Sequence, residues 1–231
     1  MATIDGDEGR GLLAEQRRAA IAAQVRSAGG VRVTELVARF AVSDMTIRRD
    51  LDVLAREGLV DKVHGGAVAL SAGTTTYALA RKLTEVPELT VVTNSIRIAE
   101  LFASRQQQGG HRASPTVVLT GGLRTPSDAL VGPVADAAIR SLNFDLAFVG
   151  CHGISAQAGL STPNLAEAET NRAMIAAARQ VVAVADHSKW AVRGLSTFAP
   201  LSVLDRWITD AGLSEEARAE AAEQIRELIL A

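Results

Sequence analysis

The feature that most constrains the fold is an alternation of apolar runs and helical segments over the last two-thirds of this 231-residue chain. Apolar runs of strand length occupy residues 89–94, 116–120, 145–150, 180–186 and 207–210. Helical patterns occupy residues 95–105, 134–142, 165–179 and 214–230. Such alternation is typical of a mainly parallel sheet with helices on both faces. We therefore predict an α/β domain for this part of the chain.

The N-terminal part has a different pattern, with three short helices predicted over residues 15–26, 35–40 and 44–58. In the third, Ile47, Leu51 and Leu54 recur at i, i+4 and i+7, which predicts one buried stripe. Arg48 and Arg49 then fall on the outward side. Two adjacent helices joined by a tight turn are what a helix-turn-helix needs, although a solvated three-helix module would show the same periodicity.

The segment LVDKVHGGAV follows the third helix and alternates apolar and polar residues before a Gly-Gly turn. This pattern predicts a β-hairpin wing, on which Lys62 and His64 could reach DNA. The whole predicts a small winged helix-turn-helix domain before the α/β domain.

Composition excludes several classes of protein. The formal net charge is -2, which is incompatible with histone-like basicity, and the single Cys151 cannot form an intrachain disulfide. No apolar stretch approaches the roughly 20 residues of a membrane span, so we expect a cytoplasmic protein with no membrane partner. Walker, GxGxxG, HExxH and GxSxG patterns are missing from the sequence, so we predict no cofactor, no metal and no catalytic residue.

The string VSDMTIRRDLDVLAREGLVDKVHGGAV closely resembles the DNA-binding domain of the DeoR family of bacterial transcriptional regulators. The resemblance extends from Leu12 to Val68. It implies contact with double-stranded operator DNA for six residues: Ser43, Thr46, Arg48, Arg49, Lys62 and His64.

Polar loops follow the predicted strands, at the edge where parallel sheets bind ligands. Each such loop is a weak signal alone, but SAGTTTYALA, VVTNS, LTGG, GLSTPNLAEAETNRAM and VADHSKW resemble the sensor domain of the same family. That domain is similar in fold to ribose-5-phosphate isomerase, and family members respond to phosphorylated sugars or related metabolites. The resemblance implies effector contact for nine residues: Gly73, Thr74, Thr75, Asn94, Gly121, Gly122, Glu169, Asp186 and Lys189.

The junction between the predicted domains, residues 12–68 and 69–231, departs from the family pattern. Family members place a linker, a helix and a first strand between the wing and the GTTT loop, whereas only Ala67 to Leu70 are available here. Four residues span at most about 14 Å. We predict that the usual linker, the helix and part of the first strand are missing.

Together these patterns predict a sequence-specific transcriptional repressor of carbohydrate metabolism genes. A phosphorylated sugar or glycerol phosphate would release or modulate it, and a homo-oligomer is expected because paired half-sites multiply affinity. One alternative is a sugar-phosphate isomerase-like enzyme with an accessory DNA-binding domain, for which Asp186 or Glu169 would supply the base. A transcriptional activator is the other.

Overall fold

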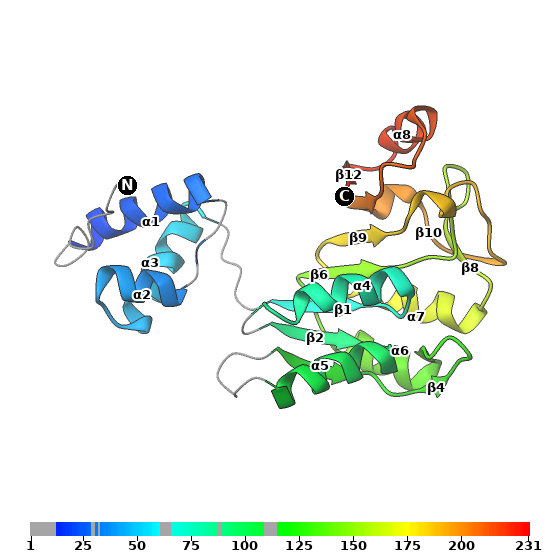
Figure 1. Cartoon of the computed structure of the whole chain (residues 1–231), viewed down its shortest axis with the longest axis horizontal. Helices are drawn as coiled ribbons and strands as arrows, with labels where there is room; N and C mark the ends of the chain where they lie inside the picture. Colours follow the sequence, from blue (N-terminus) through cyan, green and yellow to red (C-terminus); the bar gives the residue numbers. More distant parts are fainter. Residues whose placement is uncertain (1–12, 29–30, 32, 61–65, 87–88, 109–114) are drawn as a thin grey trace. The chain divides into compact units, whose positions relative to one another are not determined.

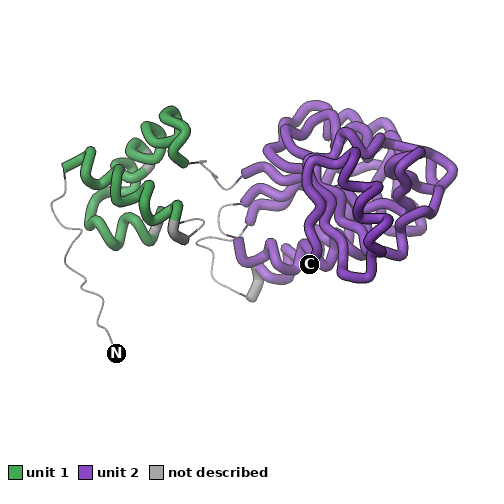
Figure 2. The backbone as a smooth tube through the Cα atoms, turned by 90° about the horizontal axis from the view of Figure 1, so that it is seen from above, with its two compact units in different colours: residues 1–63 green, residues 64–231 purple. Residues whose placement is uncertain are grey.

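The computed structural model describes residues 13–28, 31, 33–60, 66–86, 89–108 and 115–231. The chain divides into two compact units, residues 1–63 and 64–231 (Figure 2). This division lies a few residues before the predicted boundary, and Ala67 and Val68, which we had assigned to the DNA-binding domain, belong to the sheet of the second unit.

The first unit contains three helices: α1 (Ala14–Ala28), α2 (Val33–Phe40) and α3 (Asp44–Arg56). A single apolar core joins them, built mainly from Ile21, Leu36, Phe40, Ile47, Leu51 and Leu54. Ala41 joins α2 to α3 with a positive φ of 51°. That conformation makes the tight turn that a helix-turn-helix requires. Residues 61–65 of the predicted hairpin, which include Lys62 and His64, lie outside the described residues.

The second unit is built on a parallel seven-stranded sheet in the order β12-β11-β9-β6-β1-β2-β3, most of which can be followed in Figure 1. The mainly parallel α/β fold class is therefore confirmed. The strands are β1 (Ala67–Leu70), β2 (Thr90–Thr93), β3 (Thr116–Leu119), β6 (Leu146–Val149), β9 (Val181–Val184), β11 (Arg206–Thr209) and β12 (Glu227–Leu230).

Helices cover both faces of this sheet, as the apolar strands require. They are α4 (Thr74–Leu83), α5 (Ile96–Gln108), α6 (Pro133–Arg140), α7 (Leu165–Ala176) and α8 (Glu215–Ala222). Val68 and Leu70 of β1 pack in one core with α4 and α5, whereas Ala69 packs in another with α6 and α7. Alternate residues of one strand thus serve opposite faces. No helix within the described ranges is long and apolar enough to cross a membrane.

The junction strand β1 is as long as its neighbours. Its four residues pair with β2 from Ala67 to Leu70, and three of them also pair with β6. The expectation of a truncated first strand is therefore wrong, because four residues suffice for a strand in a sheet whose strands are all this short. The predicted helix over 214–230 is corrected too, since α8 ends at Ala222 and residues 227–230 form the edge strand β12.

Three short strands beside the main sheet were not predicted. They are β7 (Gly153–Ser155), β8 (Gly159–Thr162) and β10 (Ser196–Ala199), which form an antiparallel sheet in the order β10-β8-β7. A further pair, β4 (Leu123–Arg124) and β5 (Leu130–Val131), forms a two-stranded ribbon. These additions wall in the carboxyl edge of the main sheet and supply residues to the site described next.

Candidate functional sites

The start of α3 is fixed by its N-cap. The Ser43 hydroxyl accepts a hydrogen bond from the Thr46 backbone N–H at 3.2 Å, and the two side-chain hydroxyls lie 2.9 Å apart. Ser43 is thus the N-cap that the sequence predicted, and its hydrogen bond fixes the residue at which α3 begins. Both hydroxyls lie at the helix start, where a phosphate group would meet them.

The two faces of α3 differ as the periodicity predicts. Ile47, Leu51 and Leu54 are at most 9% exposed and pack in the core, whereas Met45 is 77% exposed. Arg49 is also exposed. The side chain of Arg48 is not among those the structure describes. An exposed arginine near the start of the second helix of a helix-turn-helix is suited to a DNA groove or phosphate.

Asp50, the residue that follows the arginine pair, has a structural role that sequence reasoning missed. The Arg17 Nε–H of α1 donates to its Oδ2 at 2.5 Å, and a guanidinium nitrogen of Arg18 lies 3.9 Å from its Oδ1. The Asp50 side chain is only 4% exposed. The acidic residue inside TIRRDL therefore ties α3 to α1 and faces away from the exposed surface.

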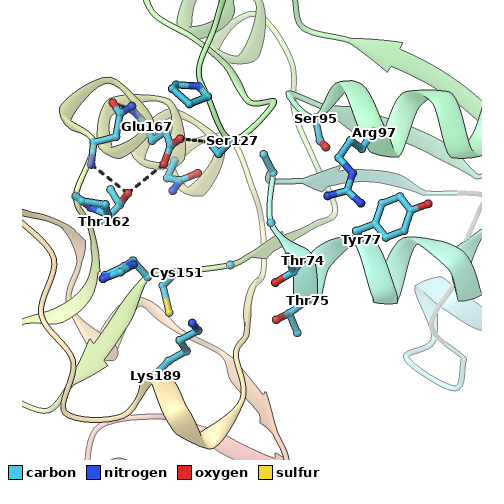
Figure 3. Close-up of a pocket in the computed structure, with 18 residues that line it drawn as sticks. Thr74, Thr75, Tyr77, Ser95, Arg97, Ser127, Cys151, Thr162, Glu167 and Lys189 are labelled. Atoms are coloured by element: carbon cyan, nitrogen blue, oxygen red, sulfur yellow. Dashed lines mark hydrogen bonds between the residues drawn. The ribbon is translucent and has the colours of Figure 1, made fainter.

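In the second unit the strand order reverses between β1 and β6, because the chain proceeds from β1 to β2 and β3 on one side and from β6 to β12 on the other. Ligands of open α/β sheets bind beyond the strand ends at such a switch point. A cavity of about 530 Å³ lies there, a size typical of small-molecule sites. It is lined by Ala72, Gly73, Thr74, Thr75, Tyr77, Ser95, Arg97, Pro126, Ser127, Gly150, Cys151, His152, Thr162, Pro163, Asn164, Glu167, Asn171 and Lys189 (Figure 3).

One side of the cavity is formed by the start of α4. Gly73 precedes this helix, and a Cβ there would lie 2.9 Å from the Thr76 Oγ1, so any other residue would have to displace the Thr76 hydroxyl. The first N–H groups of a helix have no carbonyl partner within it and carry partial positive charge. Thr74 and Thr75, for which the resemblance implied effector contact, add hydroxyls to this surface.

Two cations line the same cavity. Arg97, which the sequence analysis did not name, has its guanidinium 5.0 Å from the centre of the Tyr77 ring, in a cation–π contact. Lys189 belongs to the short 3-10 helix His187–Lys189 that follows β9. Figure 3 shows Arg97 with Tyr77 beside α4, and Lys189 extending toward the cavity from another wall.

Cys151 also lines the cavity, directly after β6. Burial raises the pKa of its thiol to about 12, against the lowering effect of nearby Lys189, while Asp186 raises it further. The thiol is therefore neutral at physiological pH, which removes its power as a nucleophile.

Among the described residues that line the cavity, the acidic one is Glu167. It lies on α7, whose start is capped by Asn164. The sequence analysis had chosen Glu169 instead, but that side chain is exposed, pairs with Arg172 and does not line the cavity. Two residues along a helix are about 200° apart, so only one of the two glutamates can face the site.

Several other predicted effector residues support the loops around the cavity and do not line it. The Asn94 Oδ1 accepts from the Ala72 N–H at 2.8 Å, and its Nδ2 donates to the Leu130 carbonyl at 3.0 Å, so this 2% exposed amide braces the loop before α4. Gly121 and Gly122 have φ values of 73° and 117°, and a Cβ on Gly122 would lie 2.6 Å from the Val131 carbonyl oxygen. Both glycines are explained by backbone geometry.

Asp186 likewise has a local role. Its carboxylate caps the 3-10 helix by accepting from the Ser188 N–H at 2.9 Å, and it also accepts from the Ser188 hydroxyl. These bonds lower its pKa, with the hydroxyl contributing most. Asp186, His187 and Asp210 bring potential metal-ligand atoms within 4.8 Å of one another, but the His187 ring and Asp210 are already hydrogen bonded at 2.7 Å.

A helix-turn-helix unit joined to an α/β unit with a cavity at its switch point defines the class of ligand-responsive, DNA-binding regulators. The comparisons agree. Residues 17–72 match the DeoR-like helix-turn-helix domain, and residues 59–211 match the DeoR C terminal sensor domain. The chain belongs to the DeoR family of transcriptional regulators, as the resemblance predicted.

Named relatives extend over nearly the whole chain. The HTH-type transcriptional regulator GlpR of Haloferax volcanii is 33% identical over 249 residues, covering 90% of this chain and 94% of its own length. The glycerol-3-phosphate regulon repressor of Escherichia coli is 28% identical over 235 residues, covering 85% and 90%. Among solved structures, ribose 5-phosphate isomerase A of Methanocaldococcus jannaschii matches with a TM-score of 0.38 and 17% identity, over 62% of this chain and 55% of its own.

These alignment lengths show that the relatives carry residues that this chain lacks. The alignment with GlpR has 249 positions, more than the 231 residues of the whole chain, although only 90% of the chain takes part. The relative therefore contains residues within the aligned region that this chain lacks. The same holds for the 235-position alignment with the Escherichia coli repressor.

Proposed function

We propose that this DeoR-family regulator represses genes of carbohydrate metabolism and that a phosphorylated sugar or glycerol phosphate, bound in the switch-point cavity, changes its affinity for operator DNA. The observation that carries the proposal is the set of anion-binding groups that line this cavity. The start of α4, two threonine hydroxyls and Arg97 form one wall, which we call the phosphate wall, and Lys189 extends toward the cavity from another (Figure 3).

A phosphate group matches this wall in charge and in hydrogen-bonding geometry. It carries one or two negative charges and accepts strong hydrogen bonds, and the cavity supplies N–H groups, hydroxyls and two cations. Of the nine predicted effector residues, Gly73, Thr74, Thr75 and Lys189 stay in the proposed contact set, and Arg97 joins them. The relative named glycerol-3-phosphate regulon repressor is consistent with a phosphorylated effector of this size.

For the DNA, we propose contacts from Ser43, Thr46, Arg48 and Arg49 of the helix start, and from Lys62 and His64 of the predicted wing. One recognition helix touches few base pairs, so a homo-oligomer that reads paired half-sites follows from the same reasoning. Because such a protein acts where the chromosome lies, the cytoplasm is the proposed location. An activator would use the same DNA contacts. Deleting the gene should raise expression of a reporter if the protein is a repressor and lower it if the protein is an activator.

We favour regulation without catalysis for the cavity. An isomerase needs a carboxylate base poised over its ligand. Glu167 is engaged by three hydroxyl groups, Asp186 caps a helix away from the cavity lining, and the Cys151 thiol is held neutral. Direct assay for interconversion of ribose 5-phosphate and ribulose 5-phosphate tests this, and any turnover above that of heat-treated protein would contradict it.

The effector part is tested with Lys189→Ala, with Lys82→Ala as the matched control on the exposed end of α4. Loss of a charge-assisted hydrogen bond worth about 1.5–3 kcal/mol should weaken effector binding by roughly tenfold to a hundredfold. Thermal shift with a panel of sugar phosphates measures it, since a ligand at 100 times its Kd adds about 2.7 kcal/mol. DNA affinity without effector should stay at the wild-type value. An unchanged effector response in Lys189→Ala would place the site elsewhere.

The DNA part is tested with Arg48→Ala and Arg49→Ala on an operator selected from a random-sequence pool. Each should weaken specific binding by about 1–3 kcal/mol while the melting temperature stays the same. Asp52→Asn, an exposed change on the same helix, is the control. Wild-type affinity in both arginine variants would overturn the proposed docking face.

A further inference from the structure

Opposite the phosphate wall, α7 places two polar side chains in the same cavity. Glu167 and Asn171 both line it and are four residues apart, so they lie one above the other on one face of the helix. Figure 3 shows Glu167 across the cavity from Thr74, Thr75 and Arg97. Neither of the α7 residues was assigned an effector role by the sequence.

The Glu167 carboxylate is held by hydroxyl groups from two other segments. Its Oε1 accepts from Ser127 at 2.6 Å and from Thr125 at 3.3 Å, and its Oε2 accepts from Thr162 at 3.1 Å. A carboxylate has about four lone-pair positions, so a fixed acceptor position remains for a further donor. The three hydroxyls fix the direction of that position, which makes it selective.

Asn171 supplies the independent observation. It is only 8% exposed, it lines the cavity, and its side chain makes no hydrogen bond to any residue within the described part of the chain. The residue is mostly buried, yet its amide is free of protein partners and faces the cavity, so it can bind a polar ligand without first breaking a hydrogen bond within the described part of the chain. Its carbonyl accepts and its NH₂ donates, a pairing that neighbouring hydroxyl groups satisfy in both directions.

We propose that Glu167 and Asn171 read the end of the effector that carries no phosphate and that they select neutral hydroxyl groups over a second anion. This inference rests on the proposed phosphate site and deepens it. The cavity then has two chemically opposite ends, one for a phosphate and one for hydroxyls. A phosphorylated acid would bring its carboxylate against Glu167, whereas a phosphorylated polyol would donate to it.

The test compares glycerol 3-phosphate and ribose 5-phosphate with 3-phosphoglycerate, by thermal shift and by release of operator DNA. The wild-type protein should bind one of the polyol phosphates at least about tenfold more tightly than the phosphorylated acid. In Glu167→Gln the polyol phosphate should lose about tenfold, while 3-phosphoglycerate should gain affinity because the repulsion is gone. Asn171→Ala should weaken the polyol phosphates without that gain.

Glu169→Gln, two residues away and exposed, is the matched control and should behave as the wild type. A gain of affinity cannot arise from a damaged fold, so it separates recognition from a structural role. Equal losses for all three compounds in Glu167→Gln, or an unchanged preference, would overturn the inference and leave the phosphate site standing. If the wild-type protein binds none of the three compounds and no inorganic phosphate, the proposed function fails and this inference fails with it.

Discussion

Removal of the Asp50 carboxylate should destabilise the DNA-binding unit and leave the stability of the sensor unit unchanged. Asp50 and Arg17 form a pair at 2.5 Å whose side chains are 4% and 10% exposed, and it joins α3 to α1. Deleting one partner of a buried pair typically costs about 3–5 kcal/mol. We expect about 3 kcal/mol for Asp50→Ala, at the low end of that range, since Arg17 keeps some access to water. That is a change of roughly a hundredfold in the unfolding equilibrium of this unit.

The unfolding of the two units can be followed separately in one denaturation experiment. Both tryptophans of the chain, Trp190 and Trp207, lie in the sensor unit, where their rings stack 5.5 Å apart. Tryptophan fluorescence therefore follows the sensor alone, whereas far-UV circular dichroism also follows the three helices of the first unit. In Asp50→Ala the circular dichroism should gain an early transition, and the fluorescence transition should stay in its wild-type position.

Two further variants test whether the Asp50–Arg17 pair is the cause of the loss in stability. Asp52→Asn, exposed on the same helix, should leave both transitions unchanged. The pair Asp50→Leu with Arg17→Met should recover most of the loss, because apolar residues of similar volume often replace a buried ion pair without cost. If Asp50→Ala shifts no transition, or if the double variant is as unstable as the single one, the pair does not hold α3 in place.

Three other outcomes follow from the structure. Iodoacetamide at pH 8 should alkylate Cys151 at least about a hundredfold more slowly than free cysteine, because burial raises its pKa to about 12; labelling at the free rate, followed by mass spectrometry, would contradict this. The backbone N–H groups of His187 and Gly212 lower the pKa of Asp210 to about 2, so its stabilising effect is complete above the ordinary value of 3.8 and is lost as the pH falls toward 2. The difference in melting temperature between wild type and Asp210→Asn should therefore shrink below pH 4, and a constant difference would refute the assignment. Finally, a chain given a linker and a helix before β1, as the family resemblance implies, should show a larger effector response than the present chain; an equal response would show that the short junction suffices for regulation.

The apolar periodicity predicted those helices and strands whose own residues show a clear helical or strand pattern. The buried stripe of α3 and the main strands from β2 to β11 follow from residue patterns that no tertiary contact has to override. The strand β12 was predicted as helix because residues 223–230 favour a helix locally, and only pairing with β11 makes them a strand. The strands β7 and β8 are rich in glycine and hydroxyl residues, so they lack the apolar run that would have revealed them.

The site was harder to predict, because the type of a residue and its place in the sequence do not determine where its side chain points. Glu167 and Glu169 belong to one helix and differ only in the face they occupy, so the sequence alone could not choose between them. Asn94 is a polar residue at the end of a central strand, as the prediction required. Its side-chain amide, however, is hydrogen bonded to the backbone of Ala72 and Leu130. Arg97 became visible only when α5 brought it to the cavity beside Tyr77.

The central position of β1 has a consequence for synthesis of the protein. β1 emerges early and meets β2 soon after, but the segment that closes its other edge begins with Asp145, 78 residues beyond Ala67. At 5–20 residues per second, this edge stays open on the ribosome for roughly 4–16 s. During that interval the edge is apolar on both faces and unpaired, which are properties that attract strands of other chains, and only the shortness of β1 protects it. We therefore expect slower translation between Leu70 and Asp145 to lower the yield of folded protein without changing the stability of the finished sheet.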